Sequence, residues 1–337
     1  MYKYAHFIPQ NVAPAGATKI VVYDADGKKV CTIPLGGLTP PKGEKLYSFG
    51  LLSDIHLYPI AAVAWHPETK FDNALSFLES QGCAFVVVSG DLTQTGLSLD
   101  DTTTGLDTRQ FAKYKEICDA HQNIPVYGIC GNHESITNKD AYSMRNQRSL
   151  LVEYIGNDLY YTIERGNDLF ICIGQPDWDE VMGDDALDWL RITLADNQSK
   201  RCFVFIHSYI EEDSGDAVDY RENSVFGDWG TTKTETFMSI MRQHPNAILF
   251  HGHSHMKFEC QEYDVNATYT ERNGFRSVHV PSLGRPRNLN LSTGTTPEAD
   301  SESQGYVVDV YDDCIVLRGW DFINNKPVPL GTYKIET

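Results

Sequence analysis

The feature that most constrains the fold is a series of short apolar runs separated by helical or polar segments. Five of these runs read YSFGLLSDIH, CAFVVVSGD, IPVYGICGNHE, RCFVFIH and AILFHGHSH. Continuous apolar runs of about four to eight residues are typical of strands that are buried on both faces. Between them Phe71, Leu75 and Leu78 recur at helical spacing. We expect helices over residues 71–80, 109–121, 184–194 and 234–242.

The two ends of the chain differ from this alternating part. The C-terminal part is rich in strands, with RSVHVPSLG, GYVVDVY and CIVLRGW. Strand–helix alternation followed by further strands predicts an α/β sandwich with mixed sheets. Near the N-terminus, KIVVYDADGKKVCTIPL predicts a β-hairpin, and a linker rich in Pro and Gly follows it. We therefore divide the chain into an arm with its linker at residues 1–45 and a main domain at 46–337.

The net charge limits the partners. The chain has 28 Lys and Arg against 46 Asp and Glu, a formal net charge of −18 with neutral histidine. Because so acidic a surface repels phosphate backbones, we expect neither a nucleic-acid polymer nor an anionic membrane as a partner. A small anionic substrate remains compatible with this charge, since a bound metal reverses the local field.

Cysteine usage and the lack of long apolar segments favour a cytoplasmic location. No apolar run approaches the length of a transmembrane helix, and no apolar stretch of the signal-peptide type follows Lys3. The eight cysteines include no Cys-x-x-Cys pair. Cys83, Cys172 and Cys202 lie in or beside apolar runs, so we expect buried thiols in a reducing compartment and no disulfide framework.

Several predicted strands end in residue types that bind metals. In chain order these strand ends carry Asp54-x-His56, Gly90-Asp91, Gly131-Asn132-His133-Glu134, His207 and Gly252-His253-Ser254-His255. The carboxyl ends of strands converge in the crevice where α/β sheets bind ligands. Asp, His and Asn supply the oxygen and nitrogen donors that suit Zn, Mn or Fe. Five of the 11 histidines fall in these clusters, so the set predicts a metal site and not a series of unrelated turns.

This ordered set resembles the motifs of the calcineurin-like metallophosphoesterases, which are D-x-H, G-D, G-N-H-[ED], H and G-H-x-H. The resemblance runs from about Leu46 to Trp320, and it implies a sandwich of two mixed β-sheets flanked by helices. It also implies two divalent or trivalent ions of Mn, Fe or Zn, with a metal-bound hydroxide as the nucleophile. It assigns to the first metal Asp54, His56 and His255. It assigns to the second metal Asn132, His207 and His253. By the same resemblance Asp91 bridges the two ions and His133 faces the substrate phosphate, where it could also protonate the leaving group.

Two departures from the family pattern bear on the substrate. The protein Ser/Thr phosphatases of this superfamily carry GDxxDRG with a phosphate-binding arginine, whereas this chain has GDLTQTG. A protein phosphatase is therefore disfavoured. GDLT is similar to the class III cyclic-nucleotide phosphodiesterases and related small phosphodiesterases. Those enzymes often have His-x-Pro where this chain has His207-Ser208-Tyr209, so the identity of their substrates does not transfer.

Four features beside the motifs have two interpretations each. His251 alternates with His253 on a strand, and we favour a role in the core or in support of a ligand over a role as a ligand. Glu134 either orients a ligand or begins a helix. Arg285, in SLGRPR, either contacts a substrate phosphate or is solvated. The acidic segment 211–230 either covers the site as a lid or lies on the surface.

We therefore expect a metal-dependent phosphoesterase, a phosphoric ester hydrolase, that acts on a small phosphodiester or phosphomonoester. A nuclease of the same superfamily is the alternative among enzymes, and the acidic surface disfavours it. A non-catalytic binding or scaffold protein on the same fold is the alternative outside enzymes. Such a protein should have lost metal ligands, and none is missing here. The sequence leaves open the metals, the substrate and the oligomeric state.

Overall fold

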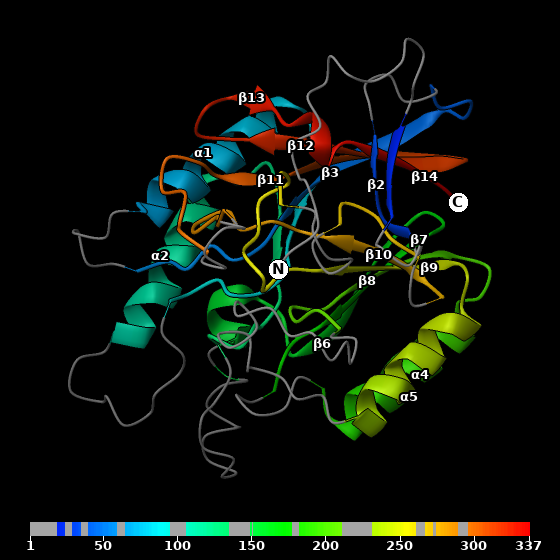
Figure 1. Ribbon diagram of the computed structural model, residues 1–337. Helices are drawn as coiled ribbons and strands as arrows, with labels where there is room; N and C mark the ends of the chain where they lie inside the picture. Colours follow the sequence, from blue (N-terminus) through cyan, green and yellow to red (C-terminus); the bar gives the residue numbers. More distant parts are fainter. Residues whose placement is uncertain are drawn as a thin grey trace.

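Two β-sheets pack face to face, and helices cover both outer faces of the pair (Figure 1). The computed structural model describes residues 19–23, 29–34, 40–58, 65–94, 106–134, 149, 151–176, 182–210, 231–260, 267–271, 274–288 and 296–337. Each sheet contains both parallel and antiparallel pairs. The predicted sandwich of two mixed β-sheets flanked by helices is confirmed.

The first sheet has the strand order β13-β12-β11-β3-β4-β5, and β14 pairs with β12. Its strands are β3 (Lys45–Leu52), β4 (Val86–Val88), β5 (Val126–Gly128), β11 (Gln304–Tyr311), β12 (Cys314–Asp321), β13 (Lys326–Pro327) and β14 (Tyr333–Glu336). The pairs β3–β4 and β4–β5 are parallel, so these three strands end at the same edge of the sheet. The C-terminal strands pair in antiparallel fashion.

The second sheet has the order β10-β9-β8-β7-β6. Its strands are β6 (Tyr160–Arg165), β7 (Asp168–Ile173), β8 (Arg201–Phe205), β9 (Ala247–His251) and β10 (Arg276–His279). All neighbours are parallel except β6 and β7. Strands β8 and β9 therefore also end at a common edge, which places the fourth and fifth sequence motifs beside one another.

Aromatic side chains fill the space between the two sheets. The rings of Phe170 and Phe203 stack with centroids 4.6 Å apart, and Phe49 of the facing sheet meets Phe170 edge to face at 5.2 Å. Ring pairs of this kind add roughly 0.5–1.5 kcal/mol beyond the burial of their area. These buried phenylalanines hold the two sheets in fixed register, so the strand ends of both sheets meet in one place.

The four predicted helices are confirmed, and three of them begin a few residues earlier than the sequence indicated. They are α1 (Pro67–Ser80), α2 (Leu106–Ala120), α4 (Asp184–Asp196) and α5 (Thr231–Gln243). Helix α1 starts with a proline, which is favoured at the first helical position because its missing N–H needs no partner there. Phe71, Leu75 and Leu78 are buried in the core between α1, α2 and the first sheet, as their spacing predicts.

The N-terminal hairpin is also confirmed. Strands β1 (Lys19–Tyr23) and β2 (Lys29–Pro34) pair in antiparallel fashion, and β2 contacts the 3-10 turn at Pro329–Gly331. The division of the chain near residue 45 stays a prediction. The acidic segment 211–230 lies outside the described residues.

The seven cysteines whose side chains the structure describes form no disulfides, and Cys83, Cys172 and Cys202 are buried as expected. No helix among the described residues has the length and apolar character needed to cross a membrane. The cytoplasmic location stays a prediction.

Candidate metal centre

The motif residues lie at the strand ends where the two sheets meet. Asp54 and His56 follow β3, Asp91 follows β4, and the Gly131–Glu134 turn follows β5. From the second sheet, His207 follows β8, and His253 and His255 follow β9. Backbone hydrogen bonds join the loops, because Asp54 N–H donates to Gly90 O and His56 N–H donates to Asp91 O, both at 3.0 Å. The site is therefore built from segments far apart in the sequence.

The backbone of these loops adopts a conformation that non-glycine residues rarely take. Seven non-glycine residues in the described part of the chain have positive φ, and five of them are predicted ligands: Asp54 (53°), His56 (53°), Asp91 (50°), His253 (71°) and His255 (60°). Each such residue costs on the order of 1–3 kcal/mol and persists only where its surroundings enforce it. This concentration of strain at the predicted ligands indicates a functional site.

Gly131 and Gly252 pack so closely against the two aspartates that no larger residue fits at either position. A Cβ on Gly131 would overlap both Oδ1 and the backbone nitrogen of Asp91. A Cβ on Gly252 would overlap the hydroxyl of Ser53 and lie 2.6 Å from Oδ2 of Asp54. The glycines of G-N-H and G-H-x-H thus let the loops approach the two aspartates.

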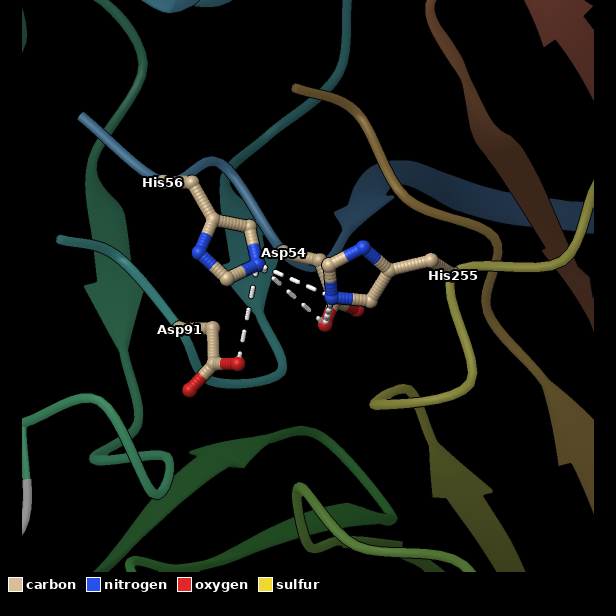
Figure 2. A group of neighbouring side chains, drawn as sticks. All are labelled: Asp54, His56, Asp91 and His255. Atoms are coloured by element: carbon tan, nitrogen blue, oxygen red, sulfur yellow. Dashed lines mark hydrogen bonds and ion pairs between the residues drawn. The ribbon is translucent and has the colours of Figure 1, made fainter. Parts of the chain in front are cut away.

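The first group of side chains consists of Asp54, His56, Asp91 and His255, and all four are buried. Nε2 of His56 and Nε2 of His255 lie 2.9 Å apart, and Nε2 of His255 lies 3.1 Å from Oδ1 of Asp54. Oδ2 of Asp91 lies 3.7 Å from Nε2 of His56. Figure 2 shows the nitrogens of the two rings directed toward each other and toward the carboxylates. Donor atoms that face one another in this way leave a common centre for a cation.

The second group consists of Asp91, His207 and His253. Oδ2 of Asp91 lies 3.0 Å from Nε2 of His207, which is 3.2 Å from Nδ1 of His253. Asp91 belongs to both groups, as expected of a bridging carboxylate. Asn132 is buried in the turn that carries His133, and its assignment to the second metal stays a prediction.

Hydrogen bonds from outside these two groups fix the orientation of the ligands. Nδ1–H of His207 donates to Ser89 O at 2.8 Å, which directs Nε2 toward Asp91. The buried carboxylate of Glu134 accepts Gly131 N–H at 2.9 Å and Thr93 N–H at 2.7 Å, and the residues that follow Glu134 lie outside the described part of the chain. Glu134 therefore joins the loops after β4 and β5, which supports the interpretation that it orients ligand residues.

The two carboxylates are held in the ionised form. Burial opposes ionisation of Asp91, but the charges of His207 and His133 hold the pKa of its carboxyl well below the usual range. Burial likewise opposes ionisation of Asp54, and the charges of His255 and His207 lower its pKa in the same way. Both side chains can therefore act as anionic metal ligands at neutral pH.

Most of the imidazoles are held in the neutral form. Burial lowers the pKa of His253 to about 3 and that of His56 well below its usual value. His207 differs: burial disfavours its charge, but Asp91 and Asp54 raise its pKa to about 10. A metal ion would displace the proton on His207, because a ligating imidazole must present a lone pair.

The donor set fits two cations. Oxygen and imidazole donors of this kind suit Mn, Fe or Zn. Two groups that share one carboxylate are the arrangement expected of a two-metal site.

The remaining predicted residues lie around this centre. Nδ1–H of His133 donates to Gln94 O, its Nε2 lies 4.0 Å from Oδ2 of Asp91, and its side chain is 22% exposed. His251 is buried beside His279, with ring centroids 5.8 Å apart, and belongs to neither group of metal-binding side chains. Arg285 contacts Gln94 and Glu298 and is not a freely solvated arginine.

Comparison with known proteins gives the class of the protein. Residues 47–257 match the model of the calcineurin-like phosphoesterases, so the chain belongs to this family. The family is dimetal-dependent, in agreement with the buried cluster. A search of curated protein sequences finds no match.

One solved structure with a TM-score above 0.5 has the same fold, and further solved structures match less well. A dimetal phosphatase from Danio rerio has a TM-score of 0.58 and 14% identity, and the match covers 87% of this chain and 99% of that one. A predicted phosphoesterase from Streptococcus pneumoniae TIGR4 has a TM-score of 0.39 and 10% identity, covering 86% and 98%. Vacuolar Protein Sorting 29 from Cryptosporidium parvum has a TM-score of 0.36 and 14% identity, covering 87% and 99%. At 14% identity the likeness to the Danio rerio structure concerns the fold alone.

Proposed function

We propose that this protein hydrolyses the phosphoester bond of a small phosphodiester or phosphomonoester with the help of two metal ions. The observation that carries the proposal is the pair of buried donor groups that share Asp91. When bound, the two ions would supply an activated water and neutralise charge that develops on the phosphoryl oxygens. Asp54, His56 and His255 would hold one ion, and Asn132, His207 and His253 the other.

His133 is the residue best placed to act on the substrate itself. Its ring stands beside Asp91, it is more exposed than the buried ligands, and the hydrogen bond to Gln94 O fixes its orientation. Since Nδ1–H donates to Gln94 O, Nε2 is the atom that we assign to a phosphoryl or leaving-group oxygen. In its protonated form Nε2–H would donate to that oxygen, as expected of a general acid.

Two features favour a small substrate. The segment after Asp91 lacks the arginine of the protein phosphatases, and the net charge of −18 opposes the basic track that a polynucleotide needs. A small anionic ester could still enter the site despite this net charge, because the metal ions would make the local field positive.

The test compares hydrolysis across substrate classes. Protein loaded with Mn²⁺ should cleave bis(p-nitrophenyl) phosphate or p-nitrophenyl phosphate, and cleave duplex DNA and a phosphopeptide much more slowly. The matched control is Asp188→Asn, which removes a carboxylate on the exposed face of α4 and should leave these rates unchanged. Rapid cleavage of duplex DNA at physiological salt would favour the nuclease, and no cleavage by fully loaded protein would favour the non-catalytic alternative.

A further inference from the structure

The segment that follows β10 is hydrogen-bonded to the metal-binding loops. Ser282 Oγ and Gly284 N–H both donate to Asp54 O at 2.9 Å. Arg287 N–H donates to His255 O at 2.8 Å. These bonds hold the 282–288 segment against two predicted ligands of the first metal. The two arginines of this segment, Arg285 and Arg287, therefore lie at the edge of the metal centre.

Arg285 is held by three neighbours. Its guanidinium donates to Oε1 of Gln94 at 3.2 Å and to Glu298, and it stacks 4.8 Å from the ring centre of Trp65. Gln94 is also the residue whose carbonyl accepts the hydrogen bond from His133. Gln94 therefore connects Arg285 to His133, the residue that we expect to face the substrate.

Arg287 has one long ion pair within the part of the chain that the structure describes. Its side chain is 25% exposed, and its guanidinium makes no hydrogen bond to any described residue. Its ion pair within the described part of the chain is with Oε1 of Glu298, at 4.0 Å, and that oxygen already accepts from Arg285. Burial and then the charge of Arg285 lower the pKa of Arg287, whereas Glu298 and Asp54 act in the opposite direction. Among the described residues, two guanidinium groups therefore share one carboxylate, and the three side chains together carry a net positive charge.

A half-buried cation that lacks hydrogen bonds is unfavourable unless an anion compensates it. Arginine is suited to such an anion, because its planar donors match two oxygens of a phosphate at once. Because Arg287 N–H bonds to His255 O, an anion bound by its guanidinium would lie near the metal centre but outside its ligand set.

We propose that Arg287, held beside Arg285, binds a second anionic group of the substrate, a phosphate other than the one that is cleaved. This inference rests on the proposed function, and it narrows the substrate class to phosphoesters that carry a second phosphate near the scissile one. Arg287 is then a specificity-determining residue, and Arg285 is a positioning residue that keeps Glu298 engaged and Gln94 in place.

The experiment uses two ligands that differ by one phosphate, thymidine 5′-phosphate and thymidine 3′,5′-bisphosphate. Their affinities for metal-loaded protein are measured by titration calorimetry. The wild type should bind the bisphosphate roughly 10- to 100-fold more tightly, the worth of one charge-assisted contact. Arg287→Gln should reduce this ratio nearly to one while affinity for the monophosphate and metal content stay unchanged. Arg287→Lys should retain part of the preference, since it keeps the charge without the planar donors.

The control variant is Arg191→Gln, which removes the same charge from the exposed surface of α4. It should keep the full preference for the bisphosphate. An equal loss in Arg191→Gln, or an unchanged ratio in Arg287→Gln, would overturn the proposal. Turnover of the 5′-p-nitrophenyl esters of the same two compounds separates this inference from the proposed function. A preference in binding without any turnover would refute hydrolysis and support the anion site, whereas turnover without any preference would refute the anion site alone.

Discussion

Replacing Asp91 with asparagine should remove the metal of the second group first. Asp91 is the sole carboxylate in the group that contains His207 and His253, whereas the first group also contains Asp54. The amide of asparagine is isosteric and its oxygen can still accept the N–H of His133, which Oδ1 of Asp91 accepts at 3.0 Å. Its NH₂ would then replace Oδ2, the oxygen that lies 3.0 Å from His207.

The size of this effect follows from the lost charge. A carboxylate about 2.1 Å from a divalent cation gains about 4 kcal/mol even at the dielectric constant of water, from 332 × 2/(80 × 2.1). Burial strengthens this attraction but also adds the cost of desolvating the carboxylate, so we keep about 4 kcal/mol, which corresponds to a roughly 10³-fold larger dissociation constant. Two stepwise constants for Mn²⁺ can be obtained by calorimetry, together with metal content by elemental analysis.

We expect Asp91→Asn to retain at most one tightly bound ion per chain, while Asp188→Asn on the surface of α4 retains two. If Asp91→Asn bound two ions with wild-type constants, Asp91 would not be a shared ligand. If the variant lost its fold instead, circular dichroism would show it, and the comparison would be repeated with Asp91→Glu, which keeps the charge.

Three further predictions test other parts of the site. His133→Gln should keep both metals but lower turnover by roughly 10²–10⁴-fold, and less for nitrophenolate leaving groups, which need no proton; rates on good and poor leaving groups check this. Gly131→Ala should lower both metal content and melting temperature, since its Cβ would overlap backbone as well as side-chain atoms of Asp91. Burial lowers the pKa of His251 to about 3 and that of His279 to about 4, whereas both titrate near 6.5 when unfolded. Stability should therefore be complete above pH 6.5 and fall as the pH drops toward 4, by up to about 2 kcal/mol per histidine at pH 5. Urea unfolding at pH 7.5 and pH 5 should show a smaller loss for His279→Gln than for the wild type, and an equal loss would contradict this assignment.

The sequence predicts a helix or strand wherever the segment itself has an apolar run or helical spacing of its apolar residues. The buried strands and the four helices have continuous apolar runs or helical spacing, and both were found. Strand β14 was missed because Ile335 is its one buried residue, so its sequence shows no apolar run. It forms because its register with β12 places Ile335 opposite Ile315, which no local pattern reveals.

The site was predictable as a set of residue types but not as a geometry. Strand-end positions identified the seven ligand-type residues, yet the 2.9 Å approach of His56 to His255 depends on pairing between segments 199 residues apart. The sequence does not predict the positive φ values either, because Asp and His are enriched in that conformation but most of them adopt negative φ. The sequence does not single out Arg287, which stands in the same SLGRPR segment as Arg285, because only the fold brings it beside His255.

The most direct test of the two-metal claim is anomalous diffraction from crystals grown with Mn²⁺, with data collected on both sides of the manganese edge. We predict two anomalous peaks on either side of the Asp91 carboxylate, one contacting Asp54, His56 and His255, and the other contacting Asn132, His207 and His253. A single peak, or peaks away from Asp91, at saturating Mn²⁺ would contradict the account.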